Sequence, residues 1–263
     1  MTDEASAAEP LGDQLARVEA MAALARFAGG VAHDLNNLLT TINGYADLAL
    51  AALAGLAGTA AHDDIGEVRR AGERTAALSR DLLVIGQRHT APQGSVEVDA
   101  VLADWLDALR EKTGTARLET SFRSSGSKIA ITPAALVRVV DNLVENAAEA
   151  IAEGGSDARR SIGVSTRLVS ALVENSIDAI VPAGMWLRLV VADDGCGMSD
   201  DARRHAFEPY FSTRPKIPGR TTGRGLGLAI VWGIVHQSGG HVGLASASDT
   251  GTFVRIYLPV VGS

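Results

Sequence analysis

The feature that most constrains the fold is a heptad rhythm of apolar residues in the first third of the chain. A first seam alternates spacings of four and three residues and comprises Leu24, Ala28, Val31, Leu35, Leu38, Ile42, Tyr45, Ala49 and Ala52. A second seam follows a Gly/Ala-rich connector and comprises Ile65, Val68, Gly72, Thr75, Leu78, Leu82 and Ile85. This period predicts two long helices, each with one apolar stripe.

Two helices with one stripe each cannot bury those stripes well by themselves. We therefore expect residues 18–90 to form a helical hairpin that pairs with a second copy into a dimeric four-helix bundle. A monomeric hairpin that packs against the rest of its own chain is the alternative. Residues 1–17 are expected to be a flexible tail, because Glu, Asp, Ala and Pro10 characterise this end of the chain.

The pattern changes at Arg88–Ser95, where helical periodicity stops and Pro and Gly appear. Short strand-like runs then mix with helical ones. The strand-like runs are ARLETSF, SIGVSTRLV, WLRLVVAD and FVRIYLP, and the helical ones are ALVRVVDNLVENAAEAI and LGLAIVWGIVHQ. This mixture predicts that residues 91–263 form an α+β sandwich with helices covering one face of the sheet.

Composition excludes several classes of protein. Of the 263 residues, 46% are hydrophobic and 21% are charged, which is typical of a globular chain. A net charge of -7 argues against a general nucleic-acid or anionic-membrane binder. The single cysteine, Cys196, excludes a disulfide framework and a multi-cysteine zinc site. Because neither a spanning segment nor a leader is evident, we expect a cytoplasmic protein without membrane insertion.

Glycines are concentrated in two segments of the second half. Ala192–Ser199 (ADDGCGMS) follows a predicted strand, and Gly223–Ile230 (GRGLGLAI) directly precedes a predicted helix. Glycines that open a helix let backbone N–H groups approach a phosphate, and the helix dipole adds to the attraction. Neither segment is a dinucleotide fingerprint or a P-loop.

The order of motifs resembles a known family. DNLVENA, DDGCGM, FEPYFSTR, GRGLGLAI and a closing GTFVRIYLP resemble the Bergerat-type (GHKL) ATP-binding α/β sandwich of sensor histidine kinases, gyrase, the Hsp90 chaperones and MutL. FAGGVAHDLNNLLTTINGY resembles the phosphoacceptor box of histidine kinases, in the HDFNNLL subgroup common among hybrid kinases. The resemblance covers roughly Ala20 to Pro259. It implies a two-component sensor histidine kinase catalytic core.

In the helical half, the resemblance makes His33 the phosphorylated histidine. It implies that Asp34 orients or deprotonates the imidazole, and that Asn37 positions water when the partner is dephosphorylated. The heptad pattern agrees independently. With Leu35 and Ile42 at position a, His33 falls at f, the outermost position, where a second domain and a partner protein can reach it.

In the second half, the resemblance implies that Asp193 accepts a hydrogen bond from the adenine amino group, while Gly195 and Gly197 let the chain turn under the base. Asn146 and Asn142 would hold Mg²⁺ against the phosphates of ATP, because Mg²⁺ accepts few protein ligands. The implied lid, roughly Ser212–Thr222, is anchored by aromatic residues. The other implied ATP-binding residues are Phe207, Tyr210, Phe211, Arg214, Gly223, Arg224, Gly225, Leu226 and Gly227.

One position separates this chain from the ATPases of the superfamily. They carry a Glu, which activates water, one helical turn before the metal-binding Asn. Here that position is Asn142, which cannot act as a general base. Glu145 is next to Asn146 and points about 100° away on a helix. The chain is therefore expected to hold ATP without hydrolysing it until His33 arrives, which disfavours a superfamily ATPase.

The expected function is autophosphorylation of His33 within a homodimer, followed by transfer of the phosphoryl group to an aspartate of a response-regulator receiver domain. ATP and Mg²⁺ are the implied cofactors, and an upstream sensor protein is a further partner. The alternative is a dimeric histidine phosphotransfer or scaffold protein whose ATP-binding-like domain is not catalytic.

Two stretches read almost alike, LVENAAEAI at Leu143–Ile151 and LVENSIDAI at Leu172–Ile180. Between Asn146 and Asp193 there is room for the rest of a helix and for two strands. Starting from Asn175, the first of those strands would be lost and the sheet could not form. We therefore place the magnesium site at Asn146, and we interpret the second stretch as part of the connection between two neighbouring strands, with a short helical turn.

Overall fold

The computed structural model describes residues 11–86, 94–124, 126–154, 160–171, 174–176, 179–214 and 225–261. The chain divides into two compact units, one formed by Leu15–Arg88 and the other containing His89–Ser263. The division falls next to the expected boundary between residues 90 and 91.

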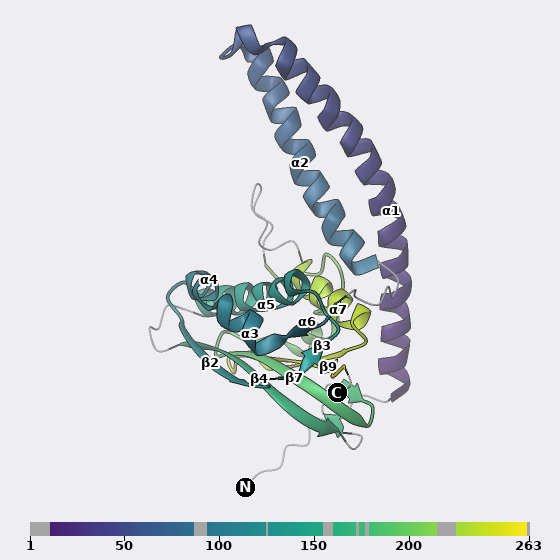
Figure 1. The fold of residues 1–263 in the computed structure, drawn as a ribbon, viewed down its shortest axis with the longest axis vertical. Coiled ribbons are helices and arrows are strands. Elements are labelled where there is room, and N and C mark those ends of the chain that lie inside the picture. The colour runs from purple at the N-terminus through teal and green to yellow at the C-terminus, as the bar shows by residue number, and fades with distance from the viewer. Residues whose placement is uncertain are drawn as a thin grey trace. The chain divides into compact units, whose positions relative to one another are not determined.

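The first unit is a helical hairpin (Figure 1). α1 (Leu11–Ala52) and α2 (Ala60–Gly86) are joined by a connection that contains a short 3₁₀ helix, η1 (Ala54–Leu56). Because α1 begins at Leu11, the expectation that the tail extends to residue 17 is wrong for residues 11–17. The reason is visible in the sequence: Pro10 is tolerated at a helix start, and Leu11, Leu15 and Val18 continue a helical spacing.

The interior of the hairpin combines small, polar and apolar residues. Ala32, Leu39 and Ala46 of α1 are buried, as are Ser79, Leu82 and Ile85 of α2. The hydroxyl of Ser79 donates to the backbone oxygen of Ala32 at 2.6 Å. Gly72 lies against Asn43, since a Cβ added at Gly72 would be 2.0 Å from Asn43 Oδ1. The face of α1 that meets α2 is therefore shifted by one residue from the predicted seam.

The predicted seam of α1 remains largely in solvent. Val31 is 47% exposed, Leu38 63%, Ile42 47% and Tyr45 70%. Their sequence spacing places them on one side of α1. A single hairpin thus leaves one apolar stripe uncovered, as the sequence predicted that it would.

The second unit is built on a five-stranded sheet in the order β2-β4-β7-β9-β8. Its strands are β2 (Arg117–Arg123), β4 (Ser161–Ala171), β7 (Gly184–Asp193), β8 (His241–Ser246) and β9 (Thr252–Pro259). β2 and β4 are parallel, and the other neighbours are antiparallel.

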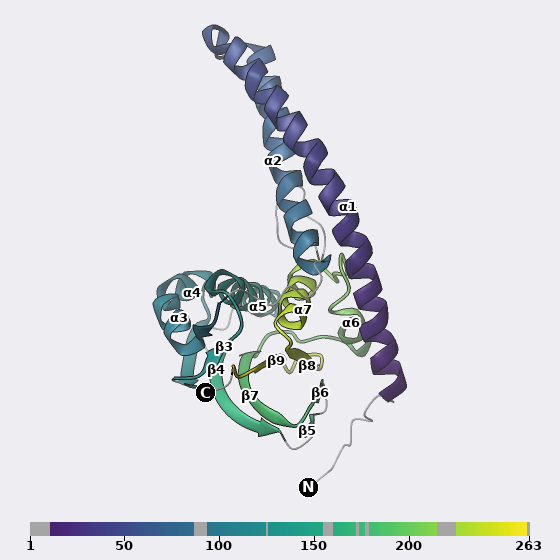
Figure 2. The same cartoon turned by 45° about the vertical axis from the view of Figure 1, so that its right-hand side comes forward.

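Helices cover one face of this sheet (Figures 1 and 2). They are α3 (Val98–Asp104), α4 (Leu106–Lys112), α5 (Pro133–Glu153) and α7 (Gly227–Gln237), and α5 packs against both α7 and β7. The core lies beneath them, where Leu187, Leu189 and Val191 of β7 are almost fully buried. The predicted α/β sandwich with one covered face is confirmed.

The four predicted strands and two predicted helices are present, but several short elements were not predicted. These are α3, α4, α6 (Asp200–His205), β8, and the strands β1 (Val96–Glu97) and β3 (Lys128–Ile129), which pair with each other. Helices of six or seven residues are too short for a periodic pattern, and β8 (HVGLAS) lacks a continuous run of β-branched residues.

The segment between β4 and β7 contains two short strands, β5 (Glu174–Ser176) and β6 (Ala179–Val181), which pair antiparallel. The prediction that it connects neighbouring strands is confirmed, because β4 pairs with β7. The predicted helical turn is wrong. Burial explains the difference: Val181 packs with Trp186 and Tyr257, and Trp186 Nε1 donates to the backbone oxygen of Pro182 at 2.9 Å.

Within the part of the chain that the structure describes, no helix combines the length and apolarity needed to cross a membrane.

Substitution of Gly72 tests the packing inside the hairpin. Gly72→Ala would place a methyl group against Asn43, and we expect the hairpin to lose about 1–3 kcal/mol of stability. Gly66→Ala is the matched control in the same helix, because the nearest atom to its added Cβ is 3.7 Å away, on the side chain of Arg70. The control should stabilise by up to about 1 kcal/mol, since Ala is the better helix former. Thermal unfolding measures both, and equal stabilisation by the two variants would contradict the packing.

Candidate functional site

The candidate site is built on a polar edge of α5. Thr132 caps the helix, since its hydroxyl accepts from the backbone N–H of Ala135 at 3.2 Å, and Pro133 occupies the first turn. One face of the helix is apolar and buried: Leu136, Val139, Val140, Leu143, Val144, Ala147, Ala150 and Ile151. The half-buried side chains of Asn142, Asn146 and Glu149 lie outside this face. The periodicity of α5 thus fixes both its apolar face and the edge that carries the two amides.

The N-terminus of α7 meets this edge at Gly227. A Cβ added at Gly227 would lie 3.1 Å from Asn142 Oδ1 and 3.3 Å from Asn146 Nδ2, so both amides are next to the first residue of the helix. Asn142 Nδ2 donates to the backbone oxygen of Arg138 at 2.7 Å, which leaves its Oδ1 as the acceptor on the side of Gly227. The preceding residue, Leu226, is buried. Free N–H groups and the helix dipole make such a terminus attractive to anions.

The turn after β7 packs its backbone directly against α5. The N–H of Cys196 donates to the backbone oxygen of Ala150 at 3.1 Å, and a Cβ added at Gly195 would lie 2.8 Å from Ala150. Gly197 has φ 66°, and a Cβ there would be 2.0 Å from the backbone oxygen of Ala247. Only glycine permits these approaches.

Asp193 is a partly buried carboxylate at the start of this turn. Burial raises the pKa of its carboxyl group to about 6, although backbone N–H groups of Gly195 and Thr252 lower it. The Gly195 N–H donates to Asp193 Oδ1 at 2.9 Å. A carboxylate with this environment still has acceptor capacity for a donor group of a ligand.

The aromatic segment that follows α6 contacts Gly225, the first residue of the second glycine segment that the structure describes. The N–H of Tyr210 donates to the backbone oxygen of Gly225 at 2.8 Å, and Tyr210 itself has φ 67°. A Cβ added at Gly225 would lie 2.2 Å from the backbone oxygen of Phe211. Phe207 and Phe211 are half-buried, and Tyr210 is 50% exposed. These contacts hold the aromatic segment against Gly225, and its role as the anchor of a lid stays a prediction.

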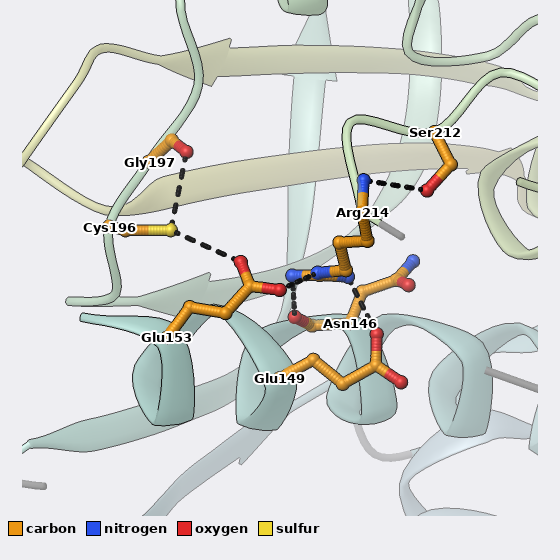
Figure 3. A network of polar contacts seen from close by, with 7 residues as sticks. All are labelled: Asn146, Glu149, Glu153, Cys196, Gly197, Ser212 and Arg214. Carbon is orange, nitrogen blue, oxygen red and sulfur yellow. Dashed lines mark hydrogen bonds and ion pairs between the residues drawn. The ribbon is translucent and has the colours of Figure 1, made fainter. Parts of the chain in front are cut away.

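Arg214 is bound to α5 beside Asn146 (Figure 3). Its Nε lies 2.5 Å from Glu153 Oε1 and its Nη1 lies 2.6 Å from Glu149 Oε2. Its Nη2 is 3.5 Å from the backbone oxygen of Asn146. Burial raises the pKa of the Glu149 carboxyl, and the guanidinium opposes that rise. Arg214 therefore lies beside Asn146, and its guanidinium is partnered by two carboxylates.

Cys196 borders the same network. Its Sγ is 3.8 Å from Glu153 Oε2, and burial together with that carboxylate raises the pKa of the thiol. A raised pKa keeps the sulfur protonated and unreactive. Cys196 therefore belongs to the packing of the turn.

The structure brings most of the predicted residues together around α5. Asn142 and Asn146 belong to α5, and contacts place Gly195, Arg214 and Gly227 against them or their helix. Asp193, Gly197, Tyr210, Phe211, Gly225 and Leu226 neighbour these residues, and Phe207 lies in the aromatic segment before Tyr210. Gly223 and Arg224, with residues 215–222 of the predicted lid, lie outside the described residues.

Sequence reasoning did not identify Glu149 and Glu153 as members of the site. Their spacing from Asn146, three and seven residues along one helix, carried the signal, because such residues share a face. Nothing in the sequence indicated that Arg214 would be their partner.

His33, Asp34 and Asn37 belong to α1, in the other unit. Asp34 and Asn37 are exposed, and their spacing of three residues places them on one side of the helix. The side chain of His33 lies outside the described residues.

Among the described residues, no group of three or more His, Cys, Asp or Glu side chains could hold a metal ion. Two amide oxygens are a sparse but suitable set for Mg²⁺, which retains waters and takes oxygens from phosphates. Asn142 Oδ1 faces the anion-binding terminus of α7, so the donor set fits a magnesium nucleotide rather than a bare ion.

Comparison with known proteins agrees with this fold. Residues 131–262 match the family described as histidine kinase-, DNA gyrase B-, and HSP90-like ATPase, and the chain belongs to this family. More particularly, the helical hairpin and the ATPase domain together resemble the catalytic core of sensor histidine kinases, to which the relatives below belong.

The chain is 31% identical over 257 residues to the sensor kinase CckA of Brucella abortus (strain 2308), covering 97% of this chain and 26% of that protein. It is 30% identical over 254 residues to the sensor histidine kinase ZraS of Klebsiella oxytoca, covering 96% and 49%. Full-length ShkA, solved in complex with AMPPNP, superimposes with a TM-score of 0.60 at 20% identity over 90% of this chain and 46% of ShkA, which shows the shared fold. The chain spans half or less of the length of these relatives.

The carboxyl group of Asp193 is expected to affect both the stability of the protein and its affinity for ATP, and substitution tests each effect. Because the pKa of its carboxyl is raised in the folded state, the ionised form costs stability, and this cost appears as the pH rises from about 4 through 6. Asp193→Asn should therefore raise the melting temperature at pH 7 and flatten its pH dependence over that range. In the parent, ATP affinity should fall as the pH drops below about 6, because the protonated carboxyl loses acceptor capacity.

Melting curves and calorimetric ATP titrations between pH 4.5 and 8 measure both effects. Asp249→Asn, at an exposed turn with φ 62°, is the control and should change neither. A lower melting temperature for Asp193→Asn at pH 7 would contradict the assigned cause.

Proposed function

We propose that this chain is an ATP-dependent protein histidine kinase that autophosphorylates His33 in a homodimer. It then transfers the phosphoryl group to an aspartate of a response-regulator receiver domain. The observation that carries the proposal is the convergence of Asp193, the amides of Asn142 and Asn146, and the N-terminus of α7 on one edge of α5. A histidine box in α1 accompanies this site in the same chain.

Each part of the site has a task in holding the nucleotide. Asp193 accepts a hydrogen bond from the adenine amino group, and the Gly195–Gly197 backbone passes under the base. The N–H groups at the start of α7 face the phosphates. Asn142 and Asn146 would hold Mg²⁺ through their amide oxygens, and the ion supplies charge neutralisation at the phosphates when it is bound.

Arg214 contributes a positive charge at this edge. Its ion pairs with Glu149 and Glu153 fix the chain after the aromatic segment to α5, beside Asn146. We infer that this anchors the start of the lid and orients the guanidinium toward the triphosphate side of the site. Because both partners are carboxylates, the anchoring is stronger than a single surface pair would provide.

In the transfer step, the neutral imidazole of His33 attacks the γ-phosphorus. The N–P bond forms as the bond between phosphorus and the leaving oxygen of ADP breaks. Asp34 orients the ring and accepts its remaining proton. Catalysis rests on positioning and charge stabilisation, as is general for phosphoryl transfer.

The site has no general base for hydrolysis at the position where ATPases of the superfamily carry Glu, since Asn142 stands there. Glu145 bonds to Lys112 of α4, and Glu149 and Glu153 bond to Arg214. The neighbouring carboxylates of α5 are thus engaged by cations. This supports a kinase that waits for His33 over a superfamily ATPase.

A dimeric phosphotransfer or scaffold protein with a non-catalytic second half is the alternative. The glycine approaches and the partly buried Asp193 disfavour it, because a domain without a ligand would gain stability by replacing that carboxylate. Dephosphorylation of the receiver domain, with Asn37 positioning water, and input from an upstream sensor protein complete the proposal.

Incubation with γ-labelled ATP tests the kinase activity. We expect acid-labile label on the parent protein, none on His33→Gln, and none on Asn146→Ala, which lacks the amide oxygen at the phosphates. Asn175→Ala, in the look-alike segment of β5, is the matched control and should retain label and ATP affinity. Label that survives His33→Gln, or ATP binding without any label on the parent, would contradict the proposal.

Dimerisation through the hairpin is tested on the exposed stripe. Leu38→Glu should convert the dimer into a monomer, because a charge would have to be buried at the interface. Thr40→Glu, at the outermost heptad position two residues on, is the control and should leave the dimer intact. Light scattering after gel filtration measures the mass, and calorimetry confirms that the monomer still binds ATP. A parent that is monomeric at micromolar concentration would contradict the dimer.

A further inference from the structure

The face of the sheet away from α5 and α7 carries a row of arginines. Side chains alternate between the two faces of a strand, so Arg188 and Val190 of β7 point away from the core that Leu187, Leu189 and Val191 form. The strand register places Arg188 opposite Arg167 of β4, and Arg167 opposite Arg123 of β2. Arg255 of β9 is opposite Val190, diagonal to Arg188.

Three of these residues, Arg123, Arg167 and Arg188, are called the arginine stripe. Arg123 and Arg167 are exposed, and Arg188 and Arg255 are half-buried. A further arginine on this face, Arg117, pairs with Glu119 at 3.5 Å. Within the described part of the chain, the side chains of Arg123, Arg167 and Arg188 make no ion pair or hydrogen bond.

The arginine stripe is positively charged, whereas the protein as a whole carries a net negative charge. The chain has 24 Lys and Arg residues against 31 Asp and Glu residues, for a net charge of -7. On this face of the described strands, Glu119 is the acid that accompanies the arginines. Neighbouring strands lie about 4.8 Å apart, and like charges directly opposite one another destabilise a sheet. Within the described residues, no ion pair or hydrogen bond of the Arg123, Arg167 and Arg188 side chains compensates for this repulsion.

The chemistry of the face favours a protein as its partner. Its cations are arginines, whose planar guanidinium forms paired hydrogen bonds to carboxylates, and it carries no lysine on these strands. Phe253 is 46% exposed two residues before Arg255, with the small residues Ala192 and Ala245 opposite. Exposed aromatic residues beside arginines, with lysine depleted, are typical of protein–protein interfaces.

Part of this sheet face is covered by β6, whereas Arg123 and Arg167 on the adjoining strands are exposed. Val181 of β6 buries Trp186 and Tyr257 at one end of the face. The stripe lies on the adjoining positions of β2, β4 and β7, on the side of the sheet opposite the helices that carry the candidate nucleotide site. A molecule bound there leaves that site accessible.

We propose that the arginine stripe and Phe253 form a docking surface for an acidic surface of a partner protein. The guanidinium groups pair with carboxylates of the partner, and binding relieves their mutual repulsion. This surface is independent of His33 and of the nucleotide site.

A fluorescein-labelled peptide of ten glutamates is the probe, titrated with the full chain at low salt and followed by anisotropy. We expect binding that weakens steeply as salt increases. The double variant Arg167→Gln/Arg188→Gln should lose at least about tenfold in affinity. The matched control is Arg110→Gln/Arg203→Gln, which removes two arginines that pair with Asp107 and Asp200 elsewhere, and it should bind as the parent does.

Two further measurements keep the result interpretable. The stripe variant should retain ATP binding and melt at the same or a higher temperature than the parent, because repulsion has been removed. Undiminished peptide binding by the folded stripe variant, or no binding by the parent, would overturn the proposal. So would tighter, stripe-dependent binding to phosphatidylserine vesicles or to single-stranded RNA, which would assign the surface to a lipid or a nucleic acid.

Discussion

The close packing of glycine backbone against α5 is the constraint on which the rest of the second unit depends. Gly195 lies against Ala150, and Gly227 lies against Asn142 and Asn146. These contacts bring the end of β7 and the start of α7, far apart in the chain, to one edge of a helix. The opposite face of α5 fills the core over β7. One helix therefore links the stability of the sandwich to the geometry of the nucleotide site.

The packing of the hairpin depends on a different set of side chains. Small and polar residues, such as Gly72 and Ser79, let α1 and α2 approach each other, while the larger apolar residues Leu38 and Tyr45 remain outside. A monomer leaves Leu38 and Tyr45 in water, although large apolar side chains stabilise most when they are buried. The proposed dimer accounts for this distribution, since the exposed stripe becomes its interface.

Three features of the molecule are locally unfavourable: the partly buried carboxylate of Asp193, the exposed apolar stripe of α1, and the arginine stripe on the open sheet face. Natural sequences are otherwise locally consistent, so such violations tend to mark positions where binding supplies the missing contact. Adenine, a second copy and an acidic partner are the contacts proposed here. Their chemistry differs, which makes the three proposals separately testable.

The sequence by itself determined the two long helices, the four main strands, α5 with its amide edge, and the family, because periodicity and motif spacing are local properties. Tertiary structure decided which side of α1 meets α2, the pairing of Arg214 with Glu149 and Glu153, and the strands β5 and β6 where a helical turn was expected. It also aligned Arg123, Arg167 and Arg188. Each of these depends on contacts between residues distant in the chain, whose register follows from the burial of the whole core and not from any local pattern.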